Sequence, residues 1–570
     1  MRPSRTATAL LAACLLVEPV LAAAARPARG VRGMVVAPEA HATEVGLAVL
    51  RSGGNAVDAA VATAFALSVT YPRAGSLGGG GFALRRGPDG AHAAIDFRET
   101  APAALRPEMF LGAGGKFDPR LAQRSGLAVG VPGLVAGLAE LHRRWGSRPW
   151  RALVAPAVDL AERGFPISEA TAENLRADDT PSKLAADPAA RALYLRGERP
   201  LATGDRLTQP ELAGTLRRIG EEGASGFYRG PVAEDVVARV RAAAGVMTLE
   251  DLAGYRAVER APLEGTFRGH RVITFPPPSS GGIVLLQILA MLERWPAGEA
   301  GPGSSLAIHR FAEAERRAFA DRARFLGDPD AVRIPIDGLL DRAYLRSRAA
   351  TIRDDRADAS ATLGAGRPAG AEGENTLHLS IADARGGAVA MTVTLNSWYG
   401  SGLLAPTSGV LLNNEMDDFA IAGAPNQFDL IGGAANAVAG GRRPLSSMTP
   451  TIVERAGTPA GGRPWLVLGS PGGPTIISSV AQVILNVVDH GLSPAEAVAR
   501  PRVHHQAIPD RLAHEPGALP DDVAAALRRR GHVLFEREPM GNVALIALDP
   551  GDGAWLGIAD PRVEGTARGY

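Results

Sequence analysis

Two short segments after residue 375 alternate strictly between polar and apolar side chains. The polar residues that could support nucleophilic chemistry are Thr376, His378 and Ser380 in the first segment and Thr392, Thr394 and Asn396 in the second. Successive side chains of a strand point to opposite faces, so each polar set shares one face. Because both apolar faces must be buried together, even-numbered residues must pair with even-numbered ones. A three-residue turn over 384–386, with Gly386 left-handed, keeps that parity and places Thr394 opposite Thr376.

Thr376 could act as a nucleophile if a base lay beside its hydroxyl group. A free α-amine on the same residue can be that base, and its pKa of about 7.7–8.0 leaves a useful fraction neutral at physiological pH. Such an amine exists only if the chain is cut before the threonine. The alternative, for an ordinary hairpin, is a polar face that is simply solvated.

The segment 354–375 favours a cut at this point. It consists almost entirely of Ala, Gly, Asp, Arg and Glu and lacks apolar periodicity, which is typical of a mobile linker. The sequence therefore predicts a precursor in which the bond between Asn375 and Thr376 is cut, giving a large fragment, 26–375, and a small fragment, 376–570.

Apolar spacing predicts the elements that must position these residues. Helices are expected over 42–51, 56–70, 135–145, 153–163, 282–295 and 306–324, and strands over 272–275, 377–381, 388–395, 410–412, 465–468 and 543–547. The helix over 56–70 is apolar all round and is expected to be buried. Strands therefore dominate after Thr376, in contrast to the helix-rich part before it.

Composition excludes several classes of function. The 570 residues carry a formal net charge of +1 without a long run of one sign, which excludes nucleic acid or an anionic membrane as an obvious partner. The only cysteine, Cys14, lies within residues 1–25, whose arginines, apolar stretch and small residues are typical of an export signal. A periplasmic or secreted protein is expected, with a lipid anchor at Cys14 as the second choice. No later segment is apolar for long enough to predict a membrane span.

Three other patterns resemble functional motifs but favour structural interpretations. The glycines 78–81 lack the Lys-Ser/Thr of a phosphate loop and predict a tight turn packed against backbone. His504 and His505 are neighbours on an extended segment and cannot share one metal ion, so no metal is predicted. Ser470 lacks the spacing of a nucleophile elbow.

Six strings in order resemble the γ-glutamyltranspeptidase family of N-terminal nucleophile hydrolases, over nearly the whole mature chain. They are Asp96-Phe97-Arg98-Glu99, Pro276-Pro277-Pro278-Ser279-Ser280-Gly281-Gly282, Asn375-Thr376-Leu377-His378, Leu411-Leu412-Asn413-Asn414-Glu415-Met416-Asp417-Asp418-Phe419, Arg443-Pro444-Leu445-Ser446-Ser447-Met448 and Gly469-Ser470-Pro471-Gly472-Gly473. The resemblance implies an α+β fold, a four-layer αββα sandwich of two stacked, mainly antiparallel sheets.

The resemblance also implies a role for each matching residue. Thr376 would cut the precursor and then attack the γ-carbonyl of glutathione or a related γ-glutamyl compound, with Thr394 bonded to its amino end. Arg98, Ser446 and Ser447 match groups that bind the substrate α-carboxylate. Asn396, Glu415 and Asp418 match groups that bind the α-ammonium, although alone the two acids would indicate a solvated turn or a calcium site. Gly472 and Gly473 match the oxyanion hole.

The implied reaction is a double displacement through a γ-glutamyl ester, released to water or to an amino-acid or peptide acceptor, with no cofactor. The two fragments would remain together as a heterodimer, and residues 418–443 would hold a lid in which Phe428 replaces a common tyrosine. Two alternatives stay open: a glutaryl or cephalosporin acylase of the same fold, and a catalytically inactive exported binding protein.

Overall fold

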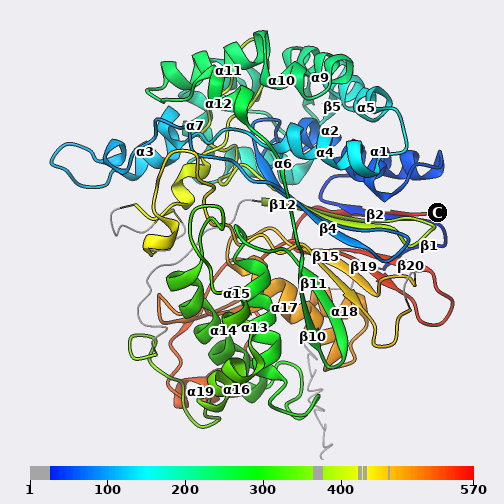
Figure 1. Cartoon of the computed structure of the whole chain (residues 1–570), viewed down its shortest axis with the longest axis vertical. Helices are drawn as coiled ribbons and strands as arrows, with labels where there is room; N and C mark the ends of the chain where they lie inside the picture. Colours follow the sequence, from blue (N-terminus) through cyan, green and yellow to red (C-terminus); the bar gives the residue numbers. More distant parts are fainter. Residues whose placement is uncertain (1–25, 364–375, 422–425, 428–432, 460–461) are drawn as a thin grey trace, which may run out of the picture.

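The computed structural model describes residues 26–363, 376–421, 426–427, 433–459 and 462–570 (Figure 1). Cys14, Asn375 and Phe428 lie outside these ranges, so the predictions that concern them are not addressed by the structure. Among the described helices, none is both long and apolar enough to cross a bilayer.

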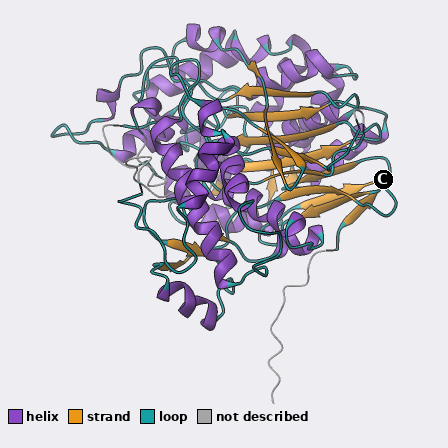
Figure 2. Cartoon of the chain, turned by 60° about the horizontal axis from the view of Figure 1, so that its bottom comes forward, coloured by secondary structure: helices purple, strands orange, loops and turns teal. Residues whose placement is uncertain are grey.

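Two seven-stranded antiparallel sheets lie face to face and are covered by helices on both outer sides (Figures 1 and 2). In spatial order, the first sheet contains β21 (Thr566–Gly569), β2 (Met34–Ala37), β12 (Thr376–Ala382), β13 (Ala388–Thr394), β3 (Gly80–Arg86), β4 (His92–Phe97) and β9 (Val258–Arg260). The second contains β1 (Ala28–Gly30), β20 (Trp555–Ala559), β19 (Ala544–Leu548), β15 (Leu466–Gly469), β14 (Thr451–Glu454), β11 (His270–Thr274) and β10 (Leu263–Phe267). The implied four-layer αββα sandwich is confirmed.

The outer helical layers each share a hydrophobic core with one sheet. The layer on the first sheet contains α1 (Ala40–Arg51), α2 (Ala56–Thr70), α4 (Leu134–Trp145), α5 (Trp150–Arg163), α6 (Glu169–Arg176), α7 (Thr180–Ala185), α8 (Pro188–Tyr194), α9 (Pro210–Glu222), α10 (Ser225–Tyr228), α11 (Pro231–Ala242) and α12 (Leu249–Gly254). The layer on the second sheet contains α13 (Gly281–Leu292), α14 (Ser305–Phe325), α15 (Ile336–Leu339), α16 (Arg342–Ala350), α17 (Thr475–Val488), α18 (Pro494–Ala499) and α19 (Asp521–Arg529). A third core fills the space between the sheets.

The remaining elements are short. They are α3 (Pro119–Arg124), the 3₁₀ turns η1 (Pro107–Phe110), η2 (Gly126–Ala128), η3 (Glu415–Asp418) and η4 (Ala434–Asn436), and the strands β5 (Phe165–Pro166), β6 (Leu195–Arg196), β7 (Arg199–Pro200), β8 (Arg206–Leu207), β16 (Val503–His504), β17 (Leu512–His514) and β18 (Leu534–Glu536). Of these, η3 contributes side chains to the site described below.

Helix α2 has the predicted bounds and the predicted burial, because all of its residues are buried. Asn55 accepts a hydrogen bond from the backbone N–H of Asp58, whose carboxylate accepts one from the N–H of Asn55. This capping box satisfies donors that would otherwise be orphaned at the start of the helix. The helix packs on β12 and β13 and supports the hairpin from behind.

The hairpin of β12 and β13 has the predicted register, with Thr376 opposite Thr394. Gly386 closes the turn with φ of +83°. The odd-numbered apolar residues pack on the helical layer, as expected. The polar face is not solvated, however, because the second sheet covers it and all residues of both strands are buried. The sequence could not show this, since the covering strands lie far away along the chain.

Each sheet contains both strands that precede residue 376 in the sequence and strands that follow it. In the first sheet, the hairpin lies between β2 and β3, which precede it by about three hundred residues of chain. In the second, β14, β15, β19 and β20 lie between β11 and β1. The two segments that flank the expected cut are therefore parts of the same sheets.

Two local predictions were wrong. Residues 410–412 form isolated bridges, with Leu411 opposite Leu404 and Leu412 beside Gly78, instead of a strand. Part of the expected mobile linker is anchored, since Asp354 pairs with Arg310 and the Ser360 N–H donates to Asp510. Residues 354–363 thus lack regular structure but are held by polar contacts.

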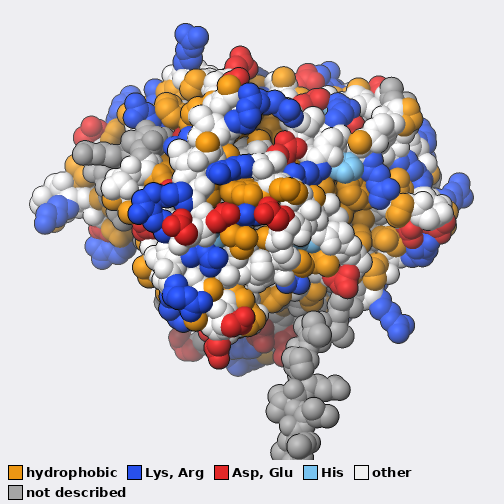
Figure 3. All heavy atoms as spheres, turned by 90° about the horizontal axis from the view of Figure 1, so that it is seen from below, with side chains coloured by type: hydrophobic (Ala, Val, Ile, Leu, Met, Phe, Trp, Pro, Cys, Tyr) orange, Lys and Arg blue, Asp and Glu red, His pale blue; other side chains and the backbone are white. Residues whose placement is uncertain are grey.

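The face seen in Figure 3 has acidic and basic side chains interspersed. On this face the described residues form no continuous basic area of the kind that nucleic-acid binding uses. The surface pattern thus agrees with the nearly balanced charge of the sequence.

Candidate active site

A small cavity of about 20 Å³ lies at the start of β12. It is lined by Arg98, Arg322, Thr376, Thr394, Asn396, Glu415, Asp418, Leu445, Ser446, Ser447, Met448, Gly473 and Ile476. Of the site residues predicted from the sequence and placed by the structure, only Gly472 is not part of this lining. The lining thus comes from seven separate parts of the chain.

Thr376 is the first residue of β12, where the strand meets the cavity, and its exposed fraction is 6%. Thr394 is its ladder partner on β13. The Thr394 hydroxyl oxygen accepts a hydrogen bond from the N–H of Asn396 at 2.8 Å. The loop after β13 is therefore tied to the threonine that faces the expected nucleophile.

His378 shares the polar face with Thr376 but is engaged elsewhere. Its Nδ1 lies 2.8 Å from the Thr392 hydroxyl and its Nε2 lies 3.2 Å from the Ser380 hydroxyl. Burial lowers the pKa of this imidazole to about 3, so it is neutral at physiological pH. Since both nitrogens have partners, His378 is poorly placed to serve as a base for Thr376.

Arg98 directly follows β4 and is held in place from several sides. Its backbone N–H donates to the Asp96 carboxylate at 2.9 Å, and its Nε donates to the Pro444 carbonyl at 3.2 Å. Its two terminal nitrogens donate to Glu415 and Asp418. The Arg98 guanidinium does not pair mainly with the neighbouring acids of its own segment, because the Asp96 carboxylate accepts from Arg260 and the Glu99 carboxylate lies 3.8 Å from Arg98.

Three acceptor groups face the cavity beside Arg98. Asn396 has φ of +71°, a conformation that asparagine tolerates better than most residues. Its side-chain amide donates to the Asn414 carbonyl at 2.9 Å, which leaves the side-chain oxygen as an acceptor. Glu415 and Asp418 lie at the two ends of η3, and Arg98 is their common partner.

The loop of Ser446 and Ser447 also lines the cavity and follows the Pro444 and Leu445 carbonyls that accept from Arg98. Ser446 Oγ accepts from the Met448 N–H at 3.2 Å, and Ser447 Oγ accepts from Arg322 at 3.1 Å. Sequence reasoning missed Arg322, which comes from α14, because an arginine near the end of an amphipathic helix ordinarily indicates a solvated face.

Gly472 and Gly473 lie between β15 and α17, as predicted. Their φ angles of +127° and +53° are in the region that favours glycine. The Gly472 carbonyl accepts from the Thr475 N–H and hydroxyl, and a side chain at position 472 would meet Thr475 at 2.5 Å. This conformation brings Gly473 into the cavity lining just before the N-terminus of α17.

The cavity lining contains two acidic side chains, Glu415 and Asp418, and two basic ones, Arg98 and Arg322. Burial raises the pKa values of Glu415 and Asp418, while the Arg98 guanidinium opposes the shift. Glu99, fully buried behind Arg98, has no hydrogen-bond partner on either carboxyl oxygen among the described residues. Burial raises its pKa from 4.5 to about 8, so it holds a proton at neutral pH.

We expect Glu99→Gln to stabilise the protein more at pH 8.5 than at pH 5.5. Because the folded-state pKa of Glu99 is raised, the folded protein binds a proton that the unfolded chain releases, and stability is lost as pH rises from about 4.5 to about 8. Glutamine cannot ionise, so the difference between the gains at the two pH values should be about 3 kcal/mol. Urea unfolding at both pH values measures it. The exposed Glu250→Gln is the control, and an equal gain at both pH values would contradict the prediction.

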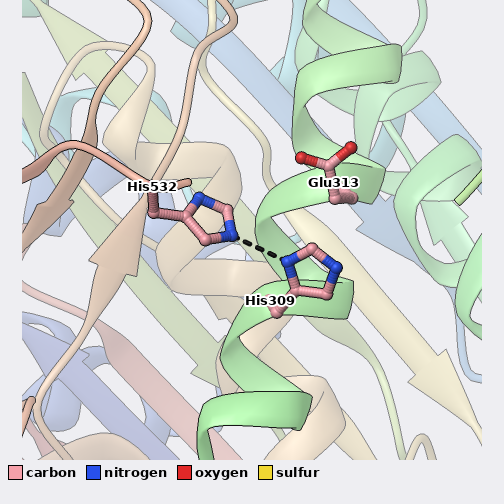
Figure 4. Close-up of side chains that lie close together, drawn as sticks. All are labelled: His309, Glu313 and His532. Atoms are coloured by element: carbon pink, nitrogen blue, oxygen red, sulfur yellow. Dashed lines mark hydrogen bonds between the residues drawn. The ribbon is translucent and has the colours of Figure 1, made fainter. Parts of the chain in front are cut away.

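One group of side chains among the described residues is compact enough to share a metal ion: the ligand atoms of His309, Glu313 and His532 lie within 4.8 Å of one another (Figure 4). His309 Nε2 lies 2.6 Å from the carbonyl of Arg353, which can only accept, so Nε2 donates and Nδ1 accepts from His532 Nε2 at 2.7 Å.

Glu313 in this group is already neutralised. Its carboxylate accepts from Arg316 at 2.9 Å and from Arg317 at 2.7 Å. A divalent cation would lie beside two buried guanidinium groups, which is electrostatically unfavourable. The hydrogen bond between His309 and His532 links α14 to the segment after α19, and we assign no ion to the cluster. His504 and His505 reach different partners, Ser478 and Asp510 respectively.

A model of the gamma-glutamyltranspeptidase family matches residues 42–570. The chain belongs to this family. It is 45% identical over 546 residues to the glutathione hydrolase proenzyme of Escherichia coli (strain K12), covering 95% of this chain and 93% of that protein.

Two solved structures agree with membership of the gamma-glutamyltranspeptidase family. A cephalosporin acylase from Bacillus halodurans has a TM-score of 0.80 at 27% identity, covering 96% of this chain and 97% of that one. A chain of the gamma-glutamyltranspeptidase from Helicobacter pylori has a TM-score of 0.56 at 40% identity, covering 57% of this chain and 93% of that one. The resemblance inferred from six motifs is confirmed, and the chain is an enzyme of this family.

Proposed function

We propose that this protein is a self-cleaving glutathione hydrolase and γ-glutamyltransferase. The observation that carries the proposal is the pairing of Arg98 with Glu415 and Asp418 inside the cavity that Thr376 lines. The α-amino-acid end of a γ-glutamyl group carries one carboxylate and one ammonium. It can insert into this internal ion pair, with its carboxylate at Arg98 and its ammonium at the acids, so that each charge gains an opposite partner.

The substrate contacts follow from the same arrangement. Ser446 and Ser447 donate to the carboxylate beside Arg98, and Asn396 accepts from the ammonium beside Glu415 and Asp418. The similarity to a glutathione hydrolase proenzyme supports glutathione as a donor.

Thr376 then attacks the γ-carbonyl carbon. Its α-amine takes the hydroxyl proton, and the C–N bond of the γ-glutamyl amide breaks as the amine leaves with a proton. The amides at Gly472 and Gly473 stabilise the oxyanion of the tetrahedral intermediate, helped by the N-terminus of α17. Thr394 orients the amino end of Thr376. Water or the amine of an amino acid or peptide then attacks the ester and restores the threonine.

The precursor is cut between Asn375 and Thr376, and fragments 26–375 and 376–570 remain together as a heterodimer. The shared sheets support this assembly. The chain matched in the Helicobacter pylori structure covers 57% of this chain, a share compatible with one fragment. The family resemblance supports a lid within residues 418–443, in which Phe428 replaces a common tyrosine.

Export to the periplasm or the medium is supported by the signal pattern of residues 1–25, with a lipid anchor at Cys14 ranked second. Cleavage after the alanines at 22–25 leaves a mature protein without cysteine, which suits an oxidising compartment.

The acylase alternative keeps the same fold and differs only in the substrate. The similarity to a cephalosporin acylase supports it. A glutaryl group lacks the α-ammonium. It would leave Glu415, Asp418 and the Asn396 oxygen without the cation that they are placed to accept. An inactive binding protein is disfavoured, because Thr376, Arg98 and Gly473 line one cavity.

We expect γ-glutamyl-p-nitroanilide to be hydrolysed at least about a hundredfold more efficiently than glutaryl-p-nitroanilide, because the latter leaves buried acceptors unpaired. Comparing kcat/KM for the two anilides tests the assignment. A matched variant, Asp418→Asn, should narrow the difference, because only the γ-glutamyl compound loses an ammonium contact, whereas any effect on Arg98 is common to both anilides. Preference of the wild type for the glutaryl compound would contradict the proposal.

A further inference from the structure

We propose that Arg322 is a positioning residue for the donor's α-carboxylate and acts through Ser447. The inference rests on the proposed function, because it specifies how one end of the γ-glutamyl group is held. Arg322 lies near the end of α14, and its exposed fraction is 5%. It lines the same cavity as Arg98, but Arg98 follows β4 of the first sheet, whereas Arg322 belongs to α14 in the helical layer on the second sheet.

Arg322 contacts two serines that belong to different segments. Its Nε donates to Ser280 Oγ at 2.8 Å, and a terminal nitrogen donates to Ser447 Oγ at 3.1 Å. A guanidinium has rigidly arranged donors, so one side chain can hold both oxygens in a fixed relation. A lysine would keep the charge but not this fork.

The hydrogen bond from Arg322 determines which hydrogen bonds the Ser447 hydroxyl can still make to a ligand. A serine hydroxyl has one hydrogen to donate and two lone pairs that accept. Because Arg322 can only donate, it uses a lone pair of Ser447 and leaves the hydroxyl hydrogen available. Ser446 is held in the same way, since its Oγ accepts from the Met448 N–H. Both serines are therefore arranged as donors, which suits a carboxylate that can only accept.

The contact with Ser280 fixes the loop that carries both serines. The N–H and the hydroxyl of Ser280 both donate to the Ser446 carbonyl at 2.7 Å. Arg322 thus binds the Ser447 hydroxyl directly and also orients the hydroxyl that holds the Ser446 backbone. This explains why a residue outside the six motifs is buried in the cavity wall.

A double-mutant cycle tests the proposal. The variants are Arg322→Gln, Ser447→Ala and the combination, with Arg322→Lys as a milder change and the exposed Arg324→Gln on the same helix as control. Kinetics use γ-glutamyl-p-nitroanilide, and rates are normalised to the cleaved fraction found by intact-mass analysis.

We expect Arg322→Gln to raise KM about tenfold to a hundredfold while kcat changes less than about threefold. Arg322→Lys should give a smaller rise in KM, and Arg324→Gln none. The combined variant should be no worse than the more damaging single variant, because each removes the same hydroxyl-to-carboxylate contact. If Arg322→Gln is not cleaved, the cycle is made with Arg322→Lys.

Additive effects of the two substitutions, or a fall in kcat without a rise in KM, would overturn the positioning role. Additivity would place Arg322 in direct contact with the substrate instead. These results differ from a failure of the proposed function, in which the wild type itself would not hydrolyse the γ-glutamyl anilide.

Discussion

Thr376→Ala leaves the protein as one uncut chain and lowers γ-glutamyl hydrolysis by at least about ten-thousandfold, since removal of a catalytic nucleophile costs at least that much in serine hydrolases. The same hydroxyl is assigned both to the cut before residue 376 and to attack on the donor. Its place at the start of β12, opposite Thr394, leaves no other hydroxyl in an equivalent position on that strand. Intact-mass analysis and hydrolysis of γ-glutamyl-p-nitroanilide measure both effects.

Thr376→Ser is the matched control, because it keeps a hydroxyl at the same position. It should still split before residue 376 and retain measurable activity. Splitting of the alanine variant at that bond would show that another group performs the cut.

Arg98→Gln should lower kcat/KM for γ-glutamyl-p-nitroanilide by about a hundredfold to a thousandfold, mostly through KM, as expected when one partner of a buried charge pair is truncated. The substitution removes the clamp on the substrate carboxylate and leaves Glu415 and Asp418 without their shared counter-charge. These acids would then take up protons and bind the substrate ammonium less well.

Two variants distinguish a role of Arg98 in binding the substrate carboxylate from a general loss of protein stability. Arg98→Lys keeps the charge but cannot make both contacts in fork geometry, so its KM should be intermediate. Arg260→Gln removes another arginine that contacts Asp96 on β4 but does not line the cavity, so it should lower stability without a comparable rise in KM. A similar KM for Arg98→Gln and the wild type would remove Arg98 from the binding site.

The parts of the structure that were predictable follow from local rules. Strict alternation and the Gly386 turn determined the hairpin register, because a shift by one residue would move every apolar side chain to the other face. Helix α2 was predictable to the residue because Asn55 caps it and its apolar residues continue on all sides. The predicted site residues were recognisable because they occur in contiguous motifs.

The rest depends on segments far apart along the chain. Burial of the hairpin's polar face depends on the second sheet, whose strands lie far away along the chain, so the sequence left a solvated face open as an alternative. At 410–412, the left-handed Gly409 and the bridges to Leu404 and Gly78 replaced a regular ladder. Arg322 reaches a serine 125 residues away, and no local pattern on α14 indicates such a partner.

The alternation of early and late strands in both sheets has a consequence for how the mature enzyme can be made. After the proposed cut, neither fragment would contain a complete sheet: β12 and β13 without β2 and β3 would expose two open edges. The pieces are therefore complementary halves of one folding unit and are not independent domains. Produced from two separate genes, they should give active enzyme only when they fold in each other's presence, whereas mixing after separate purification should yield aggregates.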